Sequence, residues 1–274
     1  MAHANRRVLP GFSLTLGYTI FYLSVLVLFP IAACFVRASQ LSFAEFWGAV
    51  WTERARAAYL LTFGSSLVAA LVNVVLGALI AWVLVRYSFP GKRVVDSLVD
   101  LPLALPTAVG GLVYASLYVK SGWLGRYLVP LGIRGAYTRL GIVLVLVFVG
   151  LPFMVRAVQP VLEDLDAEEE EASSSLGATR FQTFRHVILP ALYPAMITGF
   201  ALAFARSVGE YGSVVFISGN MPFKTEIAPV LIVARLEEFA YAEATAIAAV
   251  LLAMSFGMLV LVSVLEQWSK RSHE

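Results

Sequence analysis

The sequence predicts an all-α, polytopic membrane protein with six transmembrane helices. Hydrophobic residues make up 59% of the 274 residues and charged residues only 14%, whereas about a quarter of the residues of a soluble domain are charged. The mean hydropathy is +0.81, and six segments are apolar over a length sufficient to cross a bilayer, about 20 residues. The net charge of +2 gives no reason to expect nucleic acid as a partner, whereas membrane lipid is an expected one.

Four of the six segments contain a run without any charged residue: Val8–Val36, Ala57–Val85, Leu101–Val119 and Ala244–Leu265. The apolar run 140–155 is shorter, so we extend that helix through Arg156, whose long side chain can reach the membrane interface. We expect the six helices at about 12–36, 60–85, 98–119, 138–160, 194–217 and 244–266.

A further apolar run, Ile227–Ala234, is too short to span a bilayer. It predicts a short helix that lies at the outer surface or re-enters between the spans. The sequence contains no internal repeat, low-complexity tract or soluble domain. It therefore predicts a single transmembrane domain over 1–274.

A polar segment, EASSSLGATRFQTFRHVILP, separates two of the predicted helices and ends at Pro190. Seven of the eighteen acidic residues fall between Glu163 and Glu171, whereas Arg180 and Arg185 come later. Acids early and bases late match the dipoles of short helices, and Gly177 suits the left-handed residue that ends a helix. A second helix then presents one apolar face, formed by Phe181, Phe184 and Ile188. A charge run alone indicates a solvated loop, but the full pattern predicts a helix-turn-helix presented to a soluble partner.

The spacing within this segment resembles the EAA loop of ABC importer permeases, the element that docks into a cytoplasmic ATPase subunit. The matching residues are Glu171, Ala172, Gly177, Leu189 and Pro190. Two positions depart from the usual pattern, because Ser173 replaces the second alanine and Val187 replaces isoleucine. The resemblance implies a type I ABC importer permease fold with a cytoplasmic coupling loop at about 161–193. It also implies that Glu171 pairs with a base on the ATPase, that Gly177 makes the turn, and that Phe181 and Phe184 buttress the docked helix.

Other motifs extend the resemblance over nearly the whole chain, towards the T-subunit permeases of bacterial sulfate/thiosulfate importers. These motifs are RVLPGF at 7–12, DLP at 100–102, ALPTAV at 104–109 and RSVGEYG at 206–212, followed by Gly219-Asn220. The last motif resembles molybdate permeases as well, so molybdate or a related oxyanion is the alternative substrate.

The resemblance also implies partners: a second homologous permease, two copies of an ATP-binding subunit and a periplasmic binding protein. ATP is then used by the ATPase, and this chain binds no cofactor. The implied location is the bacterial inner membrane with both termini cytoplasmic. The charge bias alone does not give this orientation, because ten Lys and Arg would lie inside and nine outside.

The third predicted helix is interrupted by Pro102 and Pro106, which remove hydrogen-bond donors. Within a membrane such an interruption is tolerated where protein or a water-filled cavity satisfies the freed groups. Thr107 could cap a half-helix whose amides attract an anion. The alternative is an ordinary kinked helix packed among its neighbours.

The fifth predicted helix carries small residues at every fourth position: Ala201, Ala205, Gly209 and Ser213. Such a row allows close approach of another helix, either within this chain or in a second permease. The same helix contains Arg206 and Glu210, four residues apart, so the two can pair on one face. Each charge unpaired at mid-membrane costs about 2.5–3.5 kcal/mol. The pair is either a neutral structural link or a cation offered to a passing dianion and moderated by the acid.

The sequence gives no support for an enzyme. All three histidines lie outside the predicted helices, and a single cysteine, Cys34, excludes an internal disulfide. No lysine follows the GxxxxGK[ST] spacing that cradles nucleotide phosphates, and no His/Cys cluster predicts a metal site. A different class, an autonomous six-span secondary carrier, would need its own coupling-ion carboxylates. Glu210 is the one acid that lies within a predicted helix away from its ends.

Overall fold

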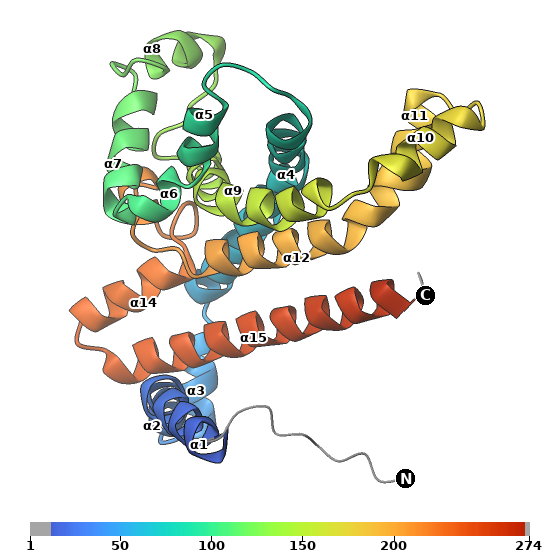
Figure 1. The fold of residues 1–274 in the computed structure, drawn as a ribbon. Helices are drawn as coiled ribbons and strands as arrows, with labels where there is room; N and C mark the ends of the chain where they lie inside the picture. Colours follow the sequence, from blue (N-terminus) through green and yellow to red (C-terminus); the bar gives the residue numbers. More distant parts are fainter. Residues whose placement is uncertain (1–11, 272–274) are drawn as a thin grey trace, which may run out of the picture.

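The structure is a computed structural model that describes residues 12–271, and within this range its regular elements are all helices, without a strand (Figure 1). Three long helices pack on one another and form the core: α4 (Glu53–Arg86), α9 (Arg139–Glu163) and α12 (Leu189–Val208). A Cβ built on Gly199 would lie 2.6 Å from the sulfur of Met154, and one on Gly77 would lie 2.7 Å from the Cγ of Met154. Small residues therefore let the three helices approach closely.

The first predicted span is a helix of three parts that packs mainly against α15. The parts are α1 (Phe12–Leu23), the π-helical turn η1 (Ser24–Leu28) and α2 (Phe29–Ala38), and α15 spans Tyr241–Arg271. A short helix, α3 (Phe43–Val50), follows and begins with a capping box between Ser42 and Glu45. The hydrogen bonds from Ser42 lower the pKa of the Glu45 carboxyl below its usual value.

Five helical segments of the described chain are long and apolar enough to span a membrane: Leu14–Ala38, Glu53–Arg86, Arg139–Glu163, Arg180–Val208 and Tyr241–Val262. The expected third helix at 98–119 is instead divided into α5 (Lys92–Val99), α6 (Leu101–Ala104) and the apolar α7 (Thr107–Tyr118). Five long helices and one shorter apolar helix are consistent with six spans. The division falls at Pro106, which precedes α7 with ψ 126°, as expected for a residue that cannot donate to the preceding turn.

The expected helix at 194–217 is also interrupted, because α12 ends at Val208 and the short α13 (Val214–Ile217) begins after a five-residue break, 209–213. The apolar run at 227–234 forms most of α14 (Ala228–Glu237), which packs on α15 and on α4. Between α7 and α9 the chain forms α8 (Gly125–Leu128) and the 3-10 turn η2 (Val129–Leu131).

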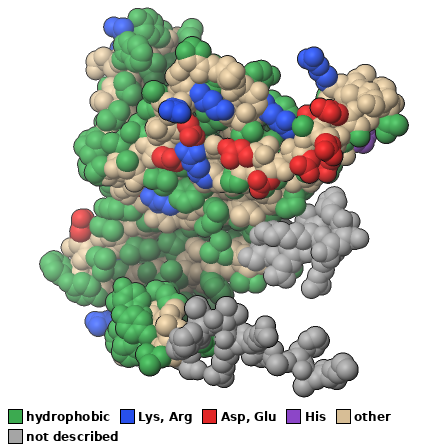
Figure 2. Space-filling view, in the orientation of Figure 1, with side chains coloured by type: hydrophobic (Ala, Val, Ile, Leu, Met, Phe, Trp, Pro, Cys, Tyr) green, Lys and Arg blue, Asp and Glu red, His purple; other side chains and the backbone are tan. Residues whose placement is uncertain are grey.

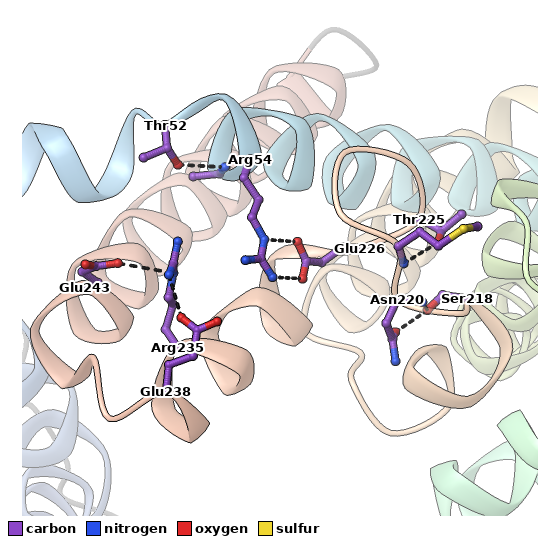
Figure 3. Close-up of polar contacts among 11 residues, drawn as sticks. Thr52, Arg54, Ser218, Asn220, Thr225, Glu226, Arg235, Glu238 and Glu243 are labelled. Carbon is purple, nitrogen blue, oxygen red and sulfur yellow. Dashed lines mark hydrogen bonds and ion pairs between the residues drawn. The ribbon is translucent and has the colours of Figure 1, made fainter.

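The segment 218–226, between α13 and α14, is fixed by polar side chains (Figure 3). Arg54, at the start of α4, forms two hydrogen bonds of 2.7 Å with the buried carboxylate of Glu226. Nearby, Arg235 pairs with Glu238 at 2.6 Å and with Glu243 at 3.3 Å. These contacts join α4, α14 and α15 at one end of the bundle. The start of α9 lies at the same end, since its first residue, Arg139, donates to the Lys224 carbonyl at 2.9 Å.

Candidate functional site: a protruding hairpin and two interrupted helices

The polar segment forms a helical hairpin that protrudes from one end of the bundle (Figure 1). Its first arm is α10 (Ala167–Ser175), and its second arm is α11 (Arg180–Thr183), which continues through the π-helical turn η3 (Phe184–Ile188) into α12. Gly177 makes the turn with φ +85°, in the left-handed region that favours glycine. A capping box between Thr179 and Gln182 starts the second arm. The local structure therefore matches the predicted helix-turn-helix.

The tip of the hairpin exposes apolar side chains beside a row of acids (Figure 2). Leu176 is 89% exposed and Phe181 is 69% exposed, while Glu171 and Ala172 are exposed on α10. Glu171 has no ion-pair partner among residues 12–271. Exposed apolar groups of this kind at the end of a polar element indicate a surface that a partner covers.

The base of the hairpin rests on α4 through contacts that sequence reasoning missed. Phe184 packs edge-on against Trp82 with the ring centroids 5.8 Å apart. Arg86 lies over the same Trp82 ring at 5.3 Å and forms an ion pair with Glu170 of α10. The signal in the sequence was Arg86 itself, the charge that ends a long apolar run. Leu189 and Pro190, half-buried, start α12 directly after the hairpin.

The two interrupted helices meet each other. A Cβ on Gly111 of α7 would lie 2.2 Å from the backbone oxygen of Ser213, and one on Gly212 would lie 2.2 Å from the Thr107 hydroxyl. Thr107 is the first residue of α7, and no side-chain cap bond is present at this helix start, whose N-cap is Pro106. Thr107 therefore packs against the break after α12 and is not the expected cap of a half-helix. Pro102 is buried within α6.

Arg206 and Glu210 form an ion pair of 2.6 Å, but Glu210 lies beyond the end of α12. Its second carboxylate oxygen accepts two hydrogen bonds of 2.9 Å, from the backbone amide and the hydroxyl of Ser213. The Glu210 side chain is 2% exposed, whereas that of Arg206 is 32% exposed. The Glu210 carboxylate thus accepts a hydrogen bond from the Ser213 amide, which the broken helix leaves without a backbone partner, and it also pairs with Arg206.

The row of small residues is shorter than the sequence suggested. Ala201 and Ala205 lie half-buried on α12, and Gly209 is exposed at its C-cap. Ser213 follows the break and is buried, so it does not continue the helical row. The row as a contact surface for another helix stays a prediction for its first three members.

The arrangement around Arg206 and Glu210 can bind an anion but offers no set of catalytic groups. Arginine carries five N–H donors in a planar fork suited to oxyanions, and one nitrogen of Arg206 is held by Glu210. The exposed part of the guanidinium is therefore available to a ligand. No group of three or more His, Cys, Asp and Glu that could hold a metal ion occurs among the described residues.

An all-helical membrane domain with a protruding hairpin has the architecture of a transport permease, and comparison with known proteins identifies its kind. The profile of the family described as binding-protein-dependent transport system inner membrane component matches residues 73–272. The chain belongs to this family, and it is a multi-pass protein of the inner membrane. The RVLPGF motif at 7–12 lies, except for Phe12, outside the described residues.

Two relatives of this chain are permease proteins of sulfate transport systems. The sulfate transport system permease protein CysT of Synechocystis is 53% identical over 253 residues, 92% of this chain and 88% of the relative. CysT of Escherichia coli is 47% identical over 265 residues, 97% of this chain and 96% of the relative. A bacterial ABC transporter involved in the import of the acidic polysaccharide alginate has a chain of the same fold, with TM-score 0.74 and 13% identity over 93% of this chain and 94% of that chain.

The contact between the interrupted helices leads to a stability test. Gly111→Ala places a methyl group against the Ser213 carbonyl, which is backbone and cannot swing away. We expect the free energy of unfolding to fall by about 1–3 kcal/mol, measured as a lower Tm of the purified protein in detergent. Gly64→Ala is the matched control, because nothing lies within 4 Å of a Cβ at Gly64. Equal Tm values for the two variants would contradict the close contact.

Proposed function

We propose that this chain is the membrane permease subunit of an ATP-driven importer for sulfate and thiosulfate. The observation that carries the proposal is the likeness to sulfate transport system permease proteins, which extends over 97% of this chain for the relatives from Salmonella typhimurium and Escherichia coli. The chain forms the translocation path and hydrolyses no ATP itself. A separate ATP-binding subunit, present in two copies, uses the ATP, and this chain binds no cofactor.

The hairpin couples the path to the ATPase. Its exposed Leu176 and Phe181 enter a cleft of the ATPase, and the unpaired Glu171 meets a base there. Force is then transmitted in two ways. The second arm continues through η3 into α12, which ends two residues after Arg206, and the base of the hairpin contacts α4 through Trp82 and Arg86. ATP-driven closure thus moves the helix that carries the cation of the path.

Arg206 offers charge-assisted hydrogen bonds to a passing dianion, and Glu210 prevents the anion from being held too tightly. A second homologous permease faces this side, with Ala201, Ala205 and Gly209 at the contact. A periplasmic binding protein delivers the substrate at the opposite end from the hairpin. This partner is supported by a fold neighbour, with TM-score 0.74 and 17% identity, whose structure is a complex with a substrate-bound periplasmic protein.

The orientation follows from the hairpin, which must face the cytoplasm to reach an ATPase. The C-terminal end of α15 lies on the same side of the bundle as the hairpin (Figure 1), so we place the C-terminus in the cytoplasm. An even number of spans places the N-terminus there too. The same side then carries Lys92 and Arg93 at the start of α5.

Two alternatives remain distinct from this proposal. A permease for molybdate or a related oxyanion shares the RSVGEYG motif and would use the same site. An autonomous secondary carrier needs no ATPase-docking hairpin and needs a titratable acid free for its coupling ion. The Glu210 carboxylate has both oxygens engaged, by Arg206 and by Ser213, which disfavours the carrier.

The substrate is tested by uptake. Deletion of this chain should abolish uptake of labelled sulfate at low external concentration, and thiosulfate should compete with sulfate in the wild type. The loss should be restored by the chain supplied in trans. Unimpaired sulfate uptake together with lost molybdate uptake would transfer the assignment to the alternative oxyanion.

The coupling role is tested at the hairpin turn. Gly177→Val imposes a left-handed conformation on a branched residue, which costs about 1–2 kcal/mol locally, while nothing lies within 4 Å of the new Cβ. We expect membrane insertion to persist and substrate-stimulated ATPase activity of the assembled complex to fall at least about tenfold. Gly132→Val carries the same strain, with φ +83° and open space, in the segment at the other end of the bundle, so it should leave coupling intact. Normal uptake by Gly177→Val would count heavily against docking.

The role of Arg206 is tested by a double replacement, because Glu210 both pairs with Arg206 and accepts hydrogen bonds from Ser213. Replacing both residues by leucine would also remove the acceptor of Ser213, so we choose Arg206→Gln with Glu210→Gln, which removes both charges and keeps an amide oxygen for Ser213. A purely structural pair should tolerate this change, because both charges are removed together and no buried charge is left without a partner. We expect the double variant to assemble with its partners and to transport sulfate at least about tenfold more slowly, measured as initial uptake rate. Arg206→Lys, which keeps the cation, should retain more activity, and wild-type uptake by the double variant would exclude the path role.

A further inference from the structure

The longest stretch of the chain without an acidic residue runs from Leu101 to Leu162. Between Leu101 and Leu162 there are five Lys and Arg and no Asp or Glu, and four of the five fall between the end of α7 and the first residue of α9: Lys120, Arg126, Arg134 and Arg139. This segment lies at the same end of the bundle as the 218–226 segment, because the Tyr137 amide donates to the Ile217 carbonyl at 2.7 Å. At this end Glu226, Glu238 and Glu243 are already paired with arginines. Glu53 and Glu237 also lie at this end, but no acid among the described residues forms an ion pair with the four cations of the basic segment.

The segment folds around a hollow, here called the basic pocket and defined by Tyr118, Lys120, Arg134 and Tyr137. Its volume is about 370 Å³. The pocket is open to solvent on one side, and it has room for a tetrahedral oxyanion that keeps part of its hydration. The segment that forms it lies away from the hairpin, at the opposite end of the bundle (Figure 1).

The two cations of the basic pocket differ from the other two cations of the segment. Arg126 lies over the ring of Tyr127 at 4.7 Å, and Arg139 donates to the Lys224 carbonyl. Lys120 and Arg134, in contrast, have no ion-pair partner in the described part of the chain. Two unpaired cations around one hollow, with no carboxylate among its lining residues, give a site suited to a divalent anion.

The walls of the basic pocket are fixed. Tyr137 has a left-handed backbone with φ +60°, a conformation that costs energy for a residue with a side chain and persists only where its surroundings hold it. Gly135 packs beneath Tyr118, since a Cβ there would lie 2.4 Å from the ring. The bond from Tyr137 to Ile217 joins the pocket to α13, whose start is held by Glu210. The pocket is thus connected by one short helix to the Arg206 site.

We propose that the basic pocket is an outer capture site for a divalent tetrahedral oxyanion, occupied before the anion reaches Arg206. The proposal rests on the proposed function for its orientation and for the kind of anion. Lys120 supplies a mobile ammonium and Arg134 a planar fork, while the tyrosines form the sides of the pocket. The pocket holds the anion that the binding protein releases and keeps it from escaping before the path opens.

The test measures the chemical reactivity of the Lys120 amine in the wild-type complex, which is assembled in nanodiscs without the binding protein. A water-soluble acylating reagent modifies accessible lysines, and mass spectrometry follows the rate at Lys120. We expect sodium sulfate to slow this modification, whereas sodium chloride at the same ionic strength does not. Lys224, exposed and outside the pocket, is the internal control and should react at the same rate in both salts. No protection of Lys120 by sulfate or by molybdate, at any concentration of either anion, would overturn the proposal.

A variant then assigns the protection to the pocket. Arg134→Gln should raise the sulfate concentration needed for half-protection of Lys120 by about tenfold, the change for loss of one charge-assisted hydrogen bond. Arg126→Gln removes the same charge from the same segment outside the pocket and should leave the concentration unchanged. Equal shifts in both variants would reduce the effect to general surface charge and would overturn a discrete site.

Two further outcomes are informative. One distinguishes an anion pocket from a protein-docking surface, and the other separates failure of the pocket proposal from failure of the substrate proposal. Protection of Lys120 that appears only when the binding protein is added, and without dependence on the anion, would identify a docking surface and overturn the proposal. Protection by molybdate but not by sulfate would support the pocket while contradicting the proposed substrate. Sulfate uptake measured on the same complex therefore fails or succeeds independently of the pocket.

Discussion

Lipid offers no hydrogen-bond partner to the backbone, so a break in a transmembrane helix must be satisfied by protein or lie at a water-filled cavity. Within residues 12–271, one break lies before α7 and another after α12, and the two pack against each other. Gly111 allows the Ser213 carbonyl to approach, and Glu210 supplies an acceptor to the Ser213 amide. The position of Arg206 depends on the same carboxylate. The ion pair is therefore inseparable from the way the fold tolerates an interrupted helix.

The hairpin and this junction lie at the two ends of α12. Because the second arm of the hairpin continues into α12 without a loop, a displacement of Gly177 and its neighbours cannot be absorbed by a flexible connection. Trp82 and Arg86 also connect the base of the hairpin to α4, which packs along α9 and α12. Packed interiors transmit displacement because they are dense. A displacement of the hairpin would therefore be passed along α12 towards Arg206.

Local patterns allowed much of this to be predicted, and non-local contacts account for what could not be. The acids, the glycine and the apolar face of the hairpin act within a few residues, so the turn at Gly177 could be read directly. The helix expected at 194–217 ended at Val208 instead, because hydropathy cannot show that the Ser213 amide bonds to a side chain. The sequence left open whether Thr107 caps a half-helix, and the structure has no side-chain cap there because Gly212 lies beside its hydroxyl. Arg54 and Glu226 are 172 positions apart, and nothing local predicts their pairing.

The sequence by itself determined the class of the protein: a helical membrane domain, its long apolar helices, and a polar hairpin placed between two of them. These features follow from composition and short-range periodicity, which act on each segment independently. The tertiary structure decided which interruptions meet, which charges are neutralised and which remain free. Arg206 is paired with the buried Glu210, whereas Lys120 and Arg134 line an open pocket without an ion-pair partner within residues 12–271. The reason is that burial and pairing depend on neighbours distant in the chain, and only packing brings those neighbours together.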